Sequence, residues 1–421
     1  MRKTTVALAL TGLMAGSAAV AQKIEFNGRG IVALSDGDMA ASAFADGKLM
    51  KEQGVRDALS VFAFPLKRGM EVGNSLVSNS ALSGNKGVVL ANDGRTAFVI
   101  ETRGMTTDSV ASVKNPSTDL PAGSAMFIVD LGNPTKPAAK KFSVGKNPMA
   151  VDMLQNQLLV TTEEAGKELR LLEIGAGGLP TRNVVVALNL TGGVRATDVT
   201  WHPGGEFIAL TLEENKEVIL YKANRNPQGK IATFLPFGKP LKVGDKPGAG
   251  MFTPDGNFYV IADLKDGKAN GEVFVVKFTT EGDAATAEHK IVSQATVGAA
   301  AEGFAMNPDG TMLVVANKKT TNQPWESTSF APKSSLSLLS LAKDGKLVNV
   351  AETELDGLMP ESVCFDKTGD NVAVAVYEYF DFGRRNGGIE FFKVNKTTPA
   401  LTKQLGKINA PRGCHALRLM N

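Results

Sequence analysis

Three stretches of the chain share one pattern: WHPGGEFIAL (201–210), FTPDGNFYVI (252–261) and MNPDGTMLVV (306–315). Each has an apolar residue, then a turn containing Pro and Gly, then a second apolar run. Short runs rich in β-branched and aromatic residues, bounded by Gly, Pro, Asn and Asp, predict strands joined by hairpin turns. Because the pattern recurs at a nearly constant interval, it indicates a repeat architecture.

The repeat extends beyond these three copies. We mark each copy by the apolar residue at the end of its first strand, and the markers are Leu90, Met153, Trp201, Phe252, Met306 and Phe365. The steps between consecutive markers are 63, 48, 51, 54 and 59 residues. Further apolar runs follow each turn, such as EVFVVKF (272–278) and SLSLLSL (335–341). Four short strands per unit of this length are typical of a β-propeller blade.

The two ends of the chain complement each other. The C-terminal segment APRGCHALRLMN (410–421) aligns with MPESVCFDKTG (359–369) and supplies a seventh marker, Ala416, but only one strand. The N-terminal runs RGIVALSDG (29–37) and LSVFAFPL (59–66) supply later strands of a unit. We therefore predict an all-β, seven-bladed propeller whose last blade combines one C-terminal strand with three N-terminal strands, which leaves no unpaired edge. The alternative, a two-sheet sandwich or two unrelated β domains, explains neither the period nor the ends.

The first segment, MRKTTVALALTGLMAGSAAVAQ (1–22), has two basic residues, an apolar run and a small-x-small site, Ala19-Val20-Ala21. This pattern is typical of a secretory signal peptide. We predict a signal peptide over residues 1–21 and a single propeller domain over residues 22–421. The expected location is the bacterial periplasm or the exterior. No later run is long enough to cross a bilayer.

Composition excludes some function classes. The chain has 46 Lys and Arg against 43 Asp and Glu, a formal net charge of +3, which argues against a nucleic-acid partner. It lacks the C-x-x-C-H, G-x-S-x-G, Walker A and H-E-x-x-H motifs, so no cofactor is indicated. The histidines, His202, His289 and His415, do not form a metal pattern.

Two features leave alternatives open. Asp36 and Asp38 in SDGD (35–38) are compatible with bound calcium, but an ordinary polar loop is favoured, and we predict no metal site. Cys364 and Cys414 fall in the innermost strands of neighbouring blades. They form either a disulfide, which the compartment permits, or two buried free thiols.

The repeat also locates candidate ligand-binding residues. Positions four residues before each marker should lie at one height around the central channel, and they are Lys86, Met149, Thr197, Gly248, Glu302, Glu361 and Arg412. Four of these, Lys86, Glu302, Glu361 and Arg412, are charged and belong to consecutive blades. They are expected to hold a polar ligand at the channel mouth, or alternatively to form a charge-compensated structural ring.

Long connections between second and third strands should open on one face, where loops on a rigid scaffold usually carry function. They run from Asp36 to Ala58, Thr102 to Ser124, Lys318 to Ser334 and Tyr377 to Gly387. The last, YEYFDFGRRNGG (377–388), supplies the ligand-binding candidates Tyr377, Arg384 and Arg385, because aromatic residues and Arg are enriched at binding hot spots. The alternative is that its aromatic residues cap the blade.

These units resemble those of the lactonase and YVTN-type seven-bladed propellers. KPGAGMFTPDGNFYVIAD (246–263) and ATDVTWHPGGEFIALTLEENKEVILYKA (196–223) carry the resemblance, which extends over most of the mature chain. In lactonase members an Arg-His pair and a Glu lie near the lactone. Glu213 (or Glu214) matches the Glu, whereas Thr197 and Asp198 occupy the Arg-His positions and Arg195 lies two residues earlier. If the chain is a lactonase, the resemblance implies Glu213 or Asp198 as the base, with Arg195 as a nearby cation.

Two functions follow from the sequence. The first is a binding module that holds a small polar ligand or a protein partner on its loop-decorated face. The alternative is a lactonase-like hydrolase of a sugar or organic-acid lactone. The sequence does not indicate the oligomeric state.

Overall fold

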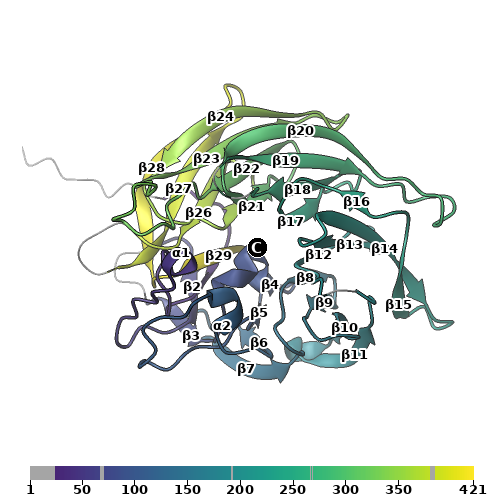
Figure 1. The fold of residues 1–421 in the computed structure, drawn as a ribbon, viewed down its shortest axis with the longest axis horizontal. Coiled ribbons are helices and arrows are strands. Elements are labelled where there is room, and N and C mark those ends of the chain that lie inside the picture. The colour runs from purple at the N-terminus through teal and green to yellow at the C-terminus, as the bar shows by residue number, and fades with distance from the viewer. Residues whose placement is uncertain (1–23, 67–70, 191–192, 266, 268, 380–384) are drawn as a thin grey trace, which may run out of the picture.

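The computed structural model describes residues 24–421 except 67–70, 191–192, 266, 268 and 380–384. The predicted signal peptide lies outside the described residues. The described chain forms seven antiparallel sheets arranged around a common centre, with one strand of each sheet at the centre and the last at the rim (Figure 1). This confirms the predicted seven-bladed β-propeller.

The first four blades in chain order after the N-terminal strands have their innermost strand first. The first comprises β4 (Val88–Leu90), β5 (Thr96–Ile100), β6 (Ala125–Asp130) and β7 (Ala138–Ser143), and the second comprises β8 (Val151–Leu154), β9 (Gln157–Thr161), β10 (Leu169–Ile174) and β11 (Pro180–Val186). The third comprises β12 (Asp198–Trp201), β13 (Phe207–Leu212), β14 (Glu217–Arg225) and β15 (Ile231–Pro236), with β16 (Leu241–Lys242) paired to β14. The fourth comprises β17 (Pro247–Phe252), β18 (Tyr259–Asp263), β19 (Asn270–Lys277) and β20 (Lys290–Ala299).

Two further blades repeat the order, and the seventh is shared by the two ends of the chain. The fifth blade comprises β21 (Ala301–Met306), β22 (Met312–Asn317), β23 (Ser334–Leu341) and β24 (Leu347–Leu355). The sixth comprises β25 (Val363–Phe365), β26 (Asn371–Val376), β27 (Gly387–Asn395) and β28 (Ala400–Ala410). The shared seventh blade comprises β29 (Cys414–Met420), β1 (Gly30–Ser35), β2 (Ala58–Ala63) and β3 (Gly73–Leu76).

The shared blade closes the ring as predicted. The C-terminal β29 is its innermost strand and pairs antiparallel with the N-terminal β1, with Val32 opposite Arg418 and Ala33 opposite Leu417. Alternate residues of a strand face opposite sides of the sheet. Ile31 and Ala33 accordingly pack with Ala373 and Ala375 of the preceding blade.

The other face of β1 packs on the following blade. Val32 and Leu34 lie in one cluster with Ala97 and Val99 of β5. All four side chains are fully buried. The shared blade therefore packs against both of its neighbours, so that the ring has no open sheet edge between its first and last blades.

The recurrent turns explain the repeated sequence pattern. In the turn after β12, the Gly205 N–H donates to the His202 carbonyl at 2.9 Å, and Gly205 has a φ of 73°. A backbone with positive φ favours glycine because a Cβ atom is disfavoured there. The copy of the repeat marked by Met153 lacks glycine in the turn after β8, and the residue with positive φ there is Gln155, at 54°.

The long loops gather on one face of the ring. The 36–57 loop contains α1 (Ala43–Asp46), and the 101–124 loop contains α2 (Pro116–Asp119). The two loops are joined by hydrogen bonds from the Leu49 N–H to the Ala111 carbonyl (3.0 Å) and from the Val113 N–H to the Gly47 carbonyl (2.9 Å). Two 3₁₀ segments complete the helical elements of the described residues, η1 (Ala81–Gly87) and η2 (Ala176–Gly178).

No helix within the described ranges is long and apolar enough to cross a membrane. Both cysteines are buried free thiols, so of the two alternatives the structure has the unbridged one. Burial raises the pKa of each thiol to about 12, which keeps both protonated at neutral pH.

Candidate functional site

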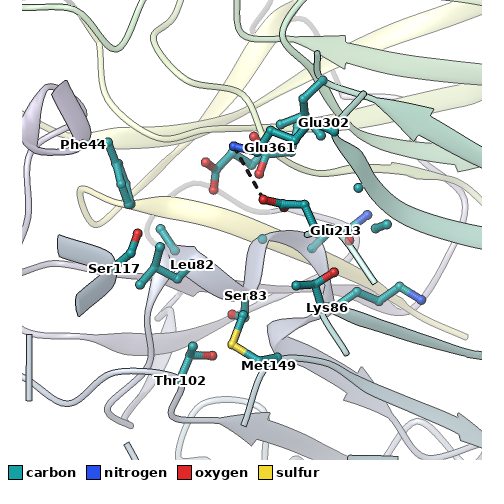
Figure 2. Close-up of a pocket in the computed structure, with 18 of the residues that line it drawn as sticks. Phe44, Leu82, Ser83, Lys86, Thr102, Ser117, Met149, Glu213, Glu302 and Glu361 are labelled. Atoms are coloured by element: carbon teal, nitrogen blue, oxygen red, sulfur yellow. Dashed lines mark ion pairs between the residues drawn. The ribbon is translucent and has the colours of Figure 1, made fainter. Parts of the chain in front are cut away.

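A cavity of about 410 Å³ lies at the channel mouth on the face that carries the long loops. Six of the seven positions aligned from the repeat line it: Lys86, Met149, Thr197, Gly248, Glu302 and Glu361. Each of these residues lies within two residues of the start of the innermost strand of its blade, which places all six at a similar level around the axis. We call this cavity the mouth pocket (Figure 2).

A second group of charged lining residues comes mostly from loops that follow the second strand of a blade. Arg103, Glu163, Glu213 and Lys318 belong to these loops, and Lys246 and Arg195 precede innermost strands. Sequence reasoning missed Arg103, Glu163, Lys246 and Lys318. The signal that finds most of them is the repeat itself, because Arg103, Glu163 and Lys318 all lie within three residues of the end of the second strand of a blade.

Loop residues cover the mouth pocket. Phe44 of α1, Ser117 of α2 and residues 81–86 of η1 contribute to its lining. Figure 2 shows Glu213, Glu302 and Glu361 on one side of the pocket, with Thr102 and Met149 on the opposite side. A Cβ atom on Gly84, whose φ is 49°, would lie 3.8 Å from Glu302 Oε1, so a larger residue there would project toward the pocket.

Lys318 lies between two carboxylates of neighbouring blades. Its ammonium group contacts Glu302 and lies 3.5 Å from Glu361 Oε1. Burial alone would lower the pKa of Lys318, but Glu302 and Glu361 outweigh burial and raise it. Burial and the charge of Glu302 raise the pKa of Glu361 to about 8, partly offset by Lys318. One cation thus compensates two carboxylates.

Lys86 does not pair with Glu302 or Glu361. Its ammonium group lies 3.1 Å from Asp198 Oδ1 and donates to the Thr200 hydroxyl at 2.8 Å. Asp198 is 1% exposed and also accepts from the Gly250 N–H at 2.8 Å. Burial raises the pKa of Asp198, although Lys86 opposes this effect. Asp198 is absent from the lining of the mouth pocket, so it lies too deep to act as the base there.

Glu213 is the carboxylate best placed for chemistry. Its side chain is 33% exposed, and its Oε1 lies 4.0 Å from the ammonium nitrogen of Lys246. Burial raises the pKa of Glu213, with Lys246 opposing the shift. Arg195 lines the same pocket and pairs with Glu214 at 2.6 Å and with Glu163 at 3.1 Å. Two of the three residues implied by the lactonase resemblance, Glu213 and Arg195, therefore share the pocket.

Arg412 is not part of the mouth pocket. It is 1% exposed, and its guanidinium donates to the carbonyls of Met50 (2.7 Å) and Gly37 (3.0 Å). The prediction that Arg412 lies with Lys86, Glu302 and Glu361 at the channel mouth is therefore wrong. The 36–57 loop covers Arg412, and the Gly37 and Met50 carbonyls accept hydrogen bonds from its guanidinium.

The aromatic loop candidates also have structural partners. Tyr377 is fully buried, and its hydroxyl donates to the Met39 carbonyl at 3.0 Å. Arg385 pairs with Glu378 at 3.2 Å and lines a separate small cavity of about 80 Å³ beside Trp325. Arg384 lies outside the described residues. Of these candidates, Tyr377 and Arg385 therefore lie outside the lining of the mouth pocket.

Oxygen ligands for a metal ion gather at one place outside the pocket. Asp36, Asp38 and Asp57 bring carboxylate oxygens within 4.8 Å of one another. Burial and the neighbouring carboxylates raise the pKa of Asp57 to about 8. The pairing of Asp36 and Asp38 with Asp57 was not visible in the sequence, because a loop of about twenty residues separates them.

Comparison with known proteins identifies the family. The family model described as "Lactonase, 7-bladed beta-propeller" matches residues 136–416. No curated protein matches the sequence.

Solved structures with the same fold include a protein of unknown function from Desulfotomaculum acetoxidans, which has 11% identity and a TM-score of 0.60 over 93% of this chain and 99% of that chain. A provisionally assigned 6-phosphogluconolactonase from Bacteroides fragilis has 14% identity and a TM-score of 0.58 over 93% and 98% of the two chains. The periplasmic gluconolactonase of Pseudomonas aeruginosa has 15% identity and a TM-score of 0.58 over 93% and 99%. At these identities the structural likeness shows the fold, and the match to the family model, which covers more than half of the sequence, shows that the chain belongs to the lactonase family of seven-bladed β-propellers.

Proposed function

We propose that the protein hydrolyses a polar lactone, of the sugar-acid class, in the mouth pocket. The observation that carries the proposal is the position of Glu213: a partly exposed carboxylate of raised pKa that shares a pocket with two cations, Lys246 and Arg195. Membership of the lactonase family supports this choice of reaction.

The chemistry requires a base and a positive charge. Glu213 takes a proton from a water molecule, and the water oxygen attacks the carbonyl carbon of the lactone. Lys246 or Arg195 stabilises the negative charge that develops on the carbonyl oxygen. The bond between the acyl carbon and the ring oxygen then breaks, and the ring oxygen receives the proton, which gives an open-chain hydroxy acid.

The size and lining of the pocket fit a small polar substrate. A cavity of about 410 Å³ is within the range of ligand pockets, which starts at roughly 300 Å³. Arg103, Arg195, Lys246 and Lys318 supply hydrogen-bond donors, and Glu163, Glu213, Glu302 and Glu361 supply hydrogen-bond acceptors for hydroxyl groups. Such a lining favours a polyhydroxylated ring over an apolar lactone.

The test is a turnover screen of the wild-type protein on a panel of sugar-acid and aliphatic lactones, with proton release followed in a pH-stat. Spontaneous ring opening is subtracted from each rate. We expect catalysed opening of polyhydroxylated lactones and little of apolar ones. No rate above the spontaneous one for any lactone at micromolar protein would contradict the proposal.

A second candidate is a binding module for a small polar ligand, without turnover. It is favoured by the pairing of the pocket cations, because Arg195, Lys246 and Lys318 each already contact a carboxylate. No histidine lines the mouth pocket among the described residues, so Glu213 has no imidazole partner there. Titration calorimetry with the same lactones and their hydroxy acids distinguishes this case, since heat of binding without proton release indicates binding alone.

We also propose that the protein acts outside the cytoplasm, in the bacterial periplasm or exterior. The N-terminal sequence pattern supports this location, and the periplasmic gluconolactonase that shares its fold is compatible with it. Fractionation of cells that express the full chain, with N-terminal sequencing of the product, tests the location and the predicted cleavage after Ala21.

A further inference from the structure

The 36–57 loop begins and ends at an acidic cluster, which comprises Asp36, Asp38 and Asp57. Asp36 directly follows β1 and Asp57 directly precedes β2. Carboxylate oxygens of the three residues lie within 4.8 Å of one another. Asp36 and Asp57 are each 1% exposed, and Asp38 is 8% exposed. Three carboxyl groups are thus held close together in a buried position.

Backbone donors fix the orientation of these carboxylates but leave one oxygen free. Asp57 accepts from the N–H groups of Gly37 (3.0 Å) and Asn79 (3.1 Å), and Asp36 Oδ2 accepts from the Ala81 N–H (2.9 Å). Asp36 Oδ1 is buried and has no hydrogen-bond partner. A buried, unpartnered carboxylate oxygen within a group of carboxylates is costly unless a cation or a proton binds it.

No side-chain cation supplies the compensation. Among the described residues, no ion pair joins a Lys, Arg or His nitrogen to Asp36, Asp38 or Asp57 within 4.0 Å; the closest ionic contact of Arg412 is to Glu52, at 4.0 Å. Arg412 donates instead to the carbonyls of Gly37 and Met50. The cluster therefore has acceptors on three sides and no positive group of its own.

We propose that the acidic cluster binds a hard divalent cation, calcium in the first instance. Calcium takes six to eight oxygen ligands in flexible geometry, and carboxylates are its preferred protein ligands. Asp36, Asp38 and Asp57 supply the charged ligands, with water completing the shell on the side of Asp38, which is the most exposed of the three.

The site holds together the segments that cover the mouth pocket. Asp36 and Asp57 are the two ends of the loop that carries Phe44, Asp36 also holds η1 through Ala81, and Asp38 Oδ2 accepts from the Thr106 N–H at 3.2 Å. A bound cation therefore fixes the 36–57 loop, η1 and the 101–124 loop relative to one another. This role does not depend on lactone hydrolysis.

The test uses the full mature protein stripped with a chelator and then titrated with calcium chloride. The melting temperature and the heat of binding are measured, with magnesium chloride and a potassium chloride solution of equal ionic strength as comparisons. We expect binding of one calcium ion per chain and a rise in melting temperature of about 5 °C at about 100-fold excess over the dissociation constant.

Asp38→Asn and Asp36→Asn are the informative variants, because an asparagine oxygen can still accept the backbone N–H bond of either residue. We expect both to melt at or above the wild-type temperature in chelator, since one repelling charge is removed, and to lose the calcium-dependent rise. Asp108→Asn, on an exposed residue of the 101–124 loop, is the matched control and should keep the rise.

Two results would overturn the proposal. One is a wild-type protein whose melting temperature and titration heat are unaffected by calcium and magnesium, which would mean that protons neutralise the cluster. The other is a calcium-dependent rise that persists unchanged in both Asp→Asn variants. A response to magnesium but not to calcium would support a divalent-cation site at the acidic cluster, with magnesium as its ion.

Discussion

Replacing Lys318 by Met tests whether the charges of the mouth pocket are coupled as the structure indicates. Met retains most of the length of the lysine side chain but leaves Glu302 and Glu361 facing each other without their cation. The Lys318 ammonium lies 3.5 Å from Glu361, a separation that corresponds to about 5 kcal/mol at an effective dielectric constant of about 20. Part of this attraction is offset by the desolvation of the lysine, so we expect a net loss of about 3–5 kcal/mol of unfolding free energy at pH 8.

The loss should depend on pH. Because burial and Glu302 raise the pKa of Glu361 to about 8, above its ordinary value of 4.5, the protonated carboxyl stabilises the fold below pH 4.5 and this contribution is lost as the pH rises through about 8. Without Lys318, nothing offsets that loss. Urea denaturation should therefore show a larger difference between variant and wild type at pH 8 than at pH 5.

Two further variants make the test specific. Lys318→Met combined with Glu361→Gln should recover most of the stability at pH 8, because one of the two carboxylates is gone. Lys333→Met removes an exposed lysine that pairs with Glu354, and it should leave the denaturation midpoint nearly unchanged at both pH values. Equal losses for Lys318→Met at pH 5 and pH 8 would refute the argument, since they would indicate lost packing rather than unbalanced charge.

Three other predictions follow from the structure. Deletion of residues 414–421 removes β29 and exposes the edge of β1, so cooperative thermal unfolding should be lost or the protein should aggregate, and an unchanged melting temperature would contradict the ring closure. Arg412→Met leaves the carbonyls of Gly37 and Met50 without donors and should cost about 3 kcal/mol in urea denaturation without changing ligand affinity; a ligand-binding defect in a fully folded variant would contradict the position of Arg412. Since burial raises the pKa of Glu213 and a general base acts when deprotonated, kcat/KM for a lactone should fall as the pH drops through a value above 4.5, and a rate that is constant down to pH 4 would exclude Glu213 as the base.

The repeat predicts the ring of pocket positions well, because a residue at a fixed place in a regular strand has a fixed height. Lys86, Met149, Thr197, Gly248, Glu302 and Glu361 all lie where the alignment puts them. The seventh position, Arg412, is covered by the 36–57 loop, whose path no repeat pattern describes. The period thus predicts the positions of residues in the regular strands, whereas an inserted loop can cover such a residue and keep it out of the pocket.

The alternation of side chains explains a second difference. Asp198 is aligned with a catalytic position by the lactonase resemblance, but it begins β12 with its carboxylate directed to Gly250 and Lys86, below the pocket. Lys318 was missed because the alignment followed only the innermost strands, whereas Lys318 directly follows the second strand of its blade. Its role emerges only when the neighbouring blade brings Glu361 to it.

The account depends most on Glu213 as the base of a lactone-opening reaction, and the kinetics of Glu213→Gln test this most directly. On a lactone that the wild-type protein opens, we expect kcat to fall by a factor of about 10²–10⁴, while affinity for the hydroxy-acid product changes little because the shape of the pocket is kept. Glu206→Gln, an exposed glutamate that pairs with Arg225 in the turn between β12 and β13, is the matched control and should keep the full rate. A Glu213→Gln variant that turns over as fast as the wild type and the control would contradict the proposed role of Glu213.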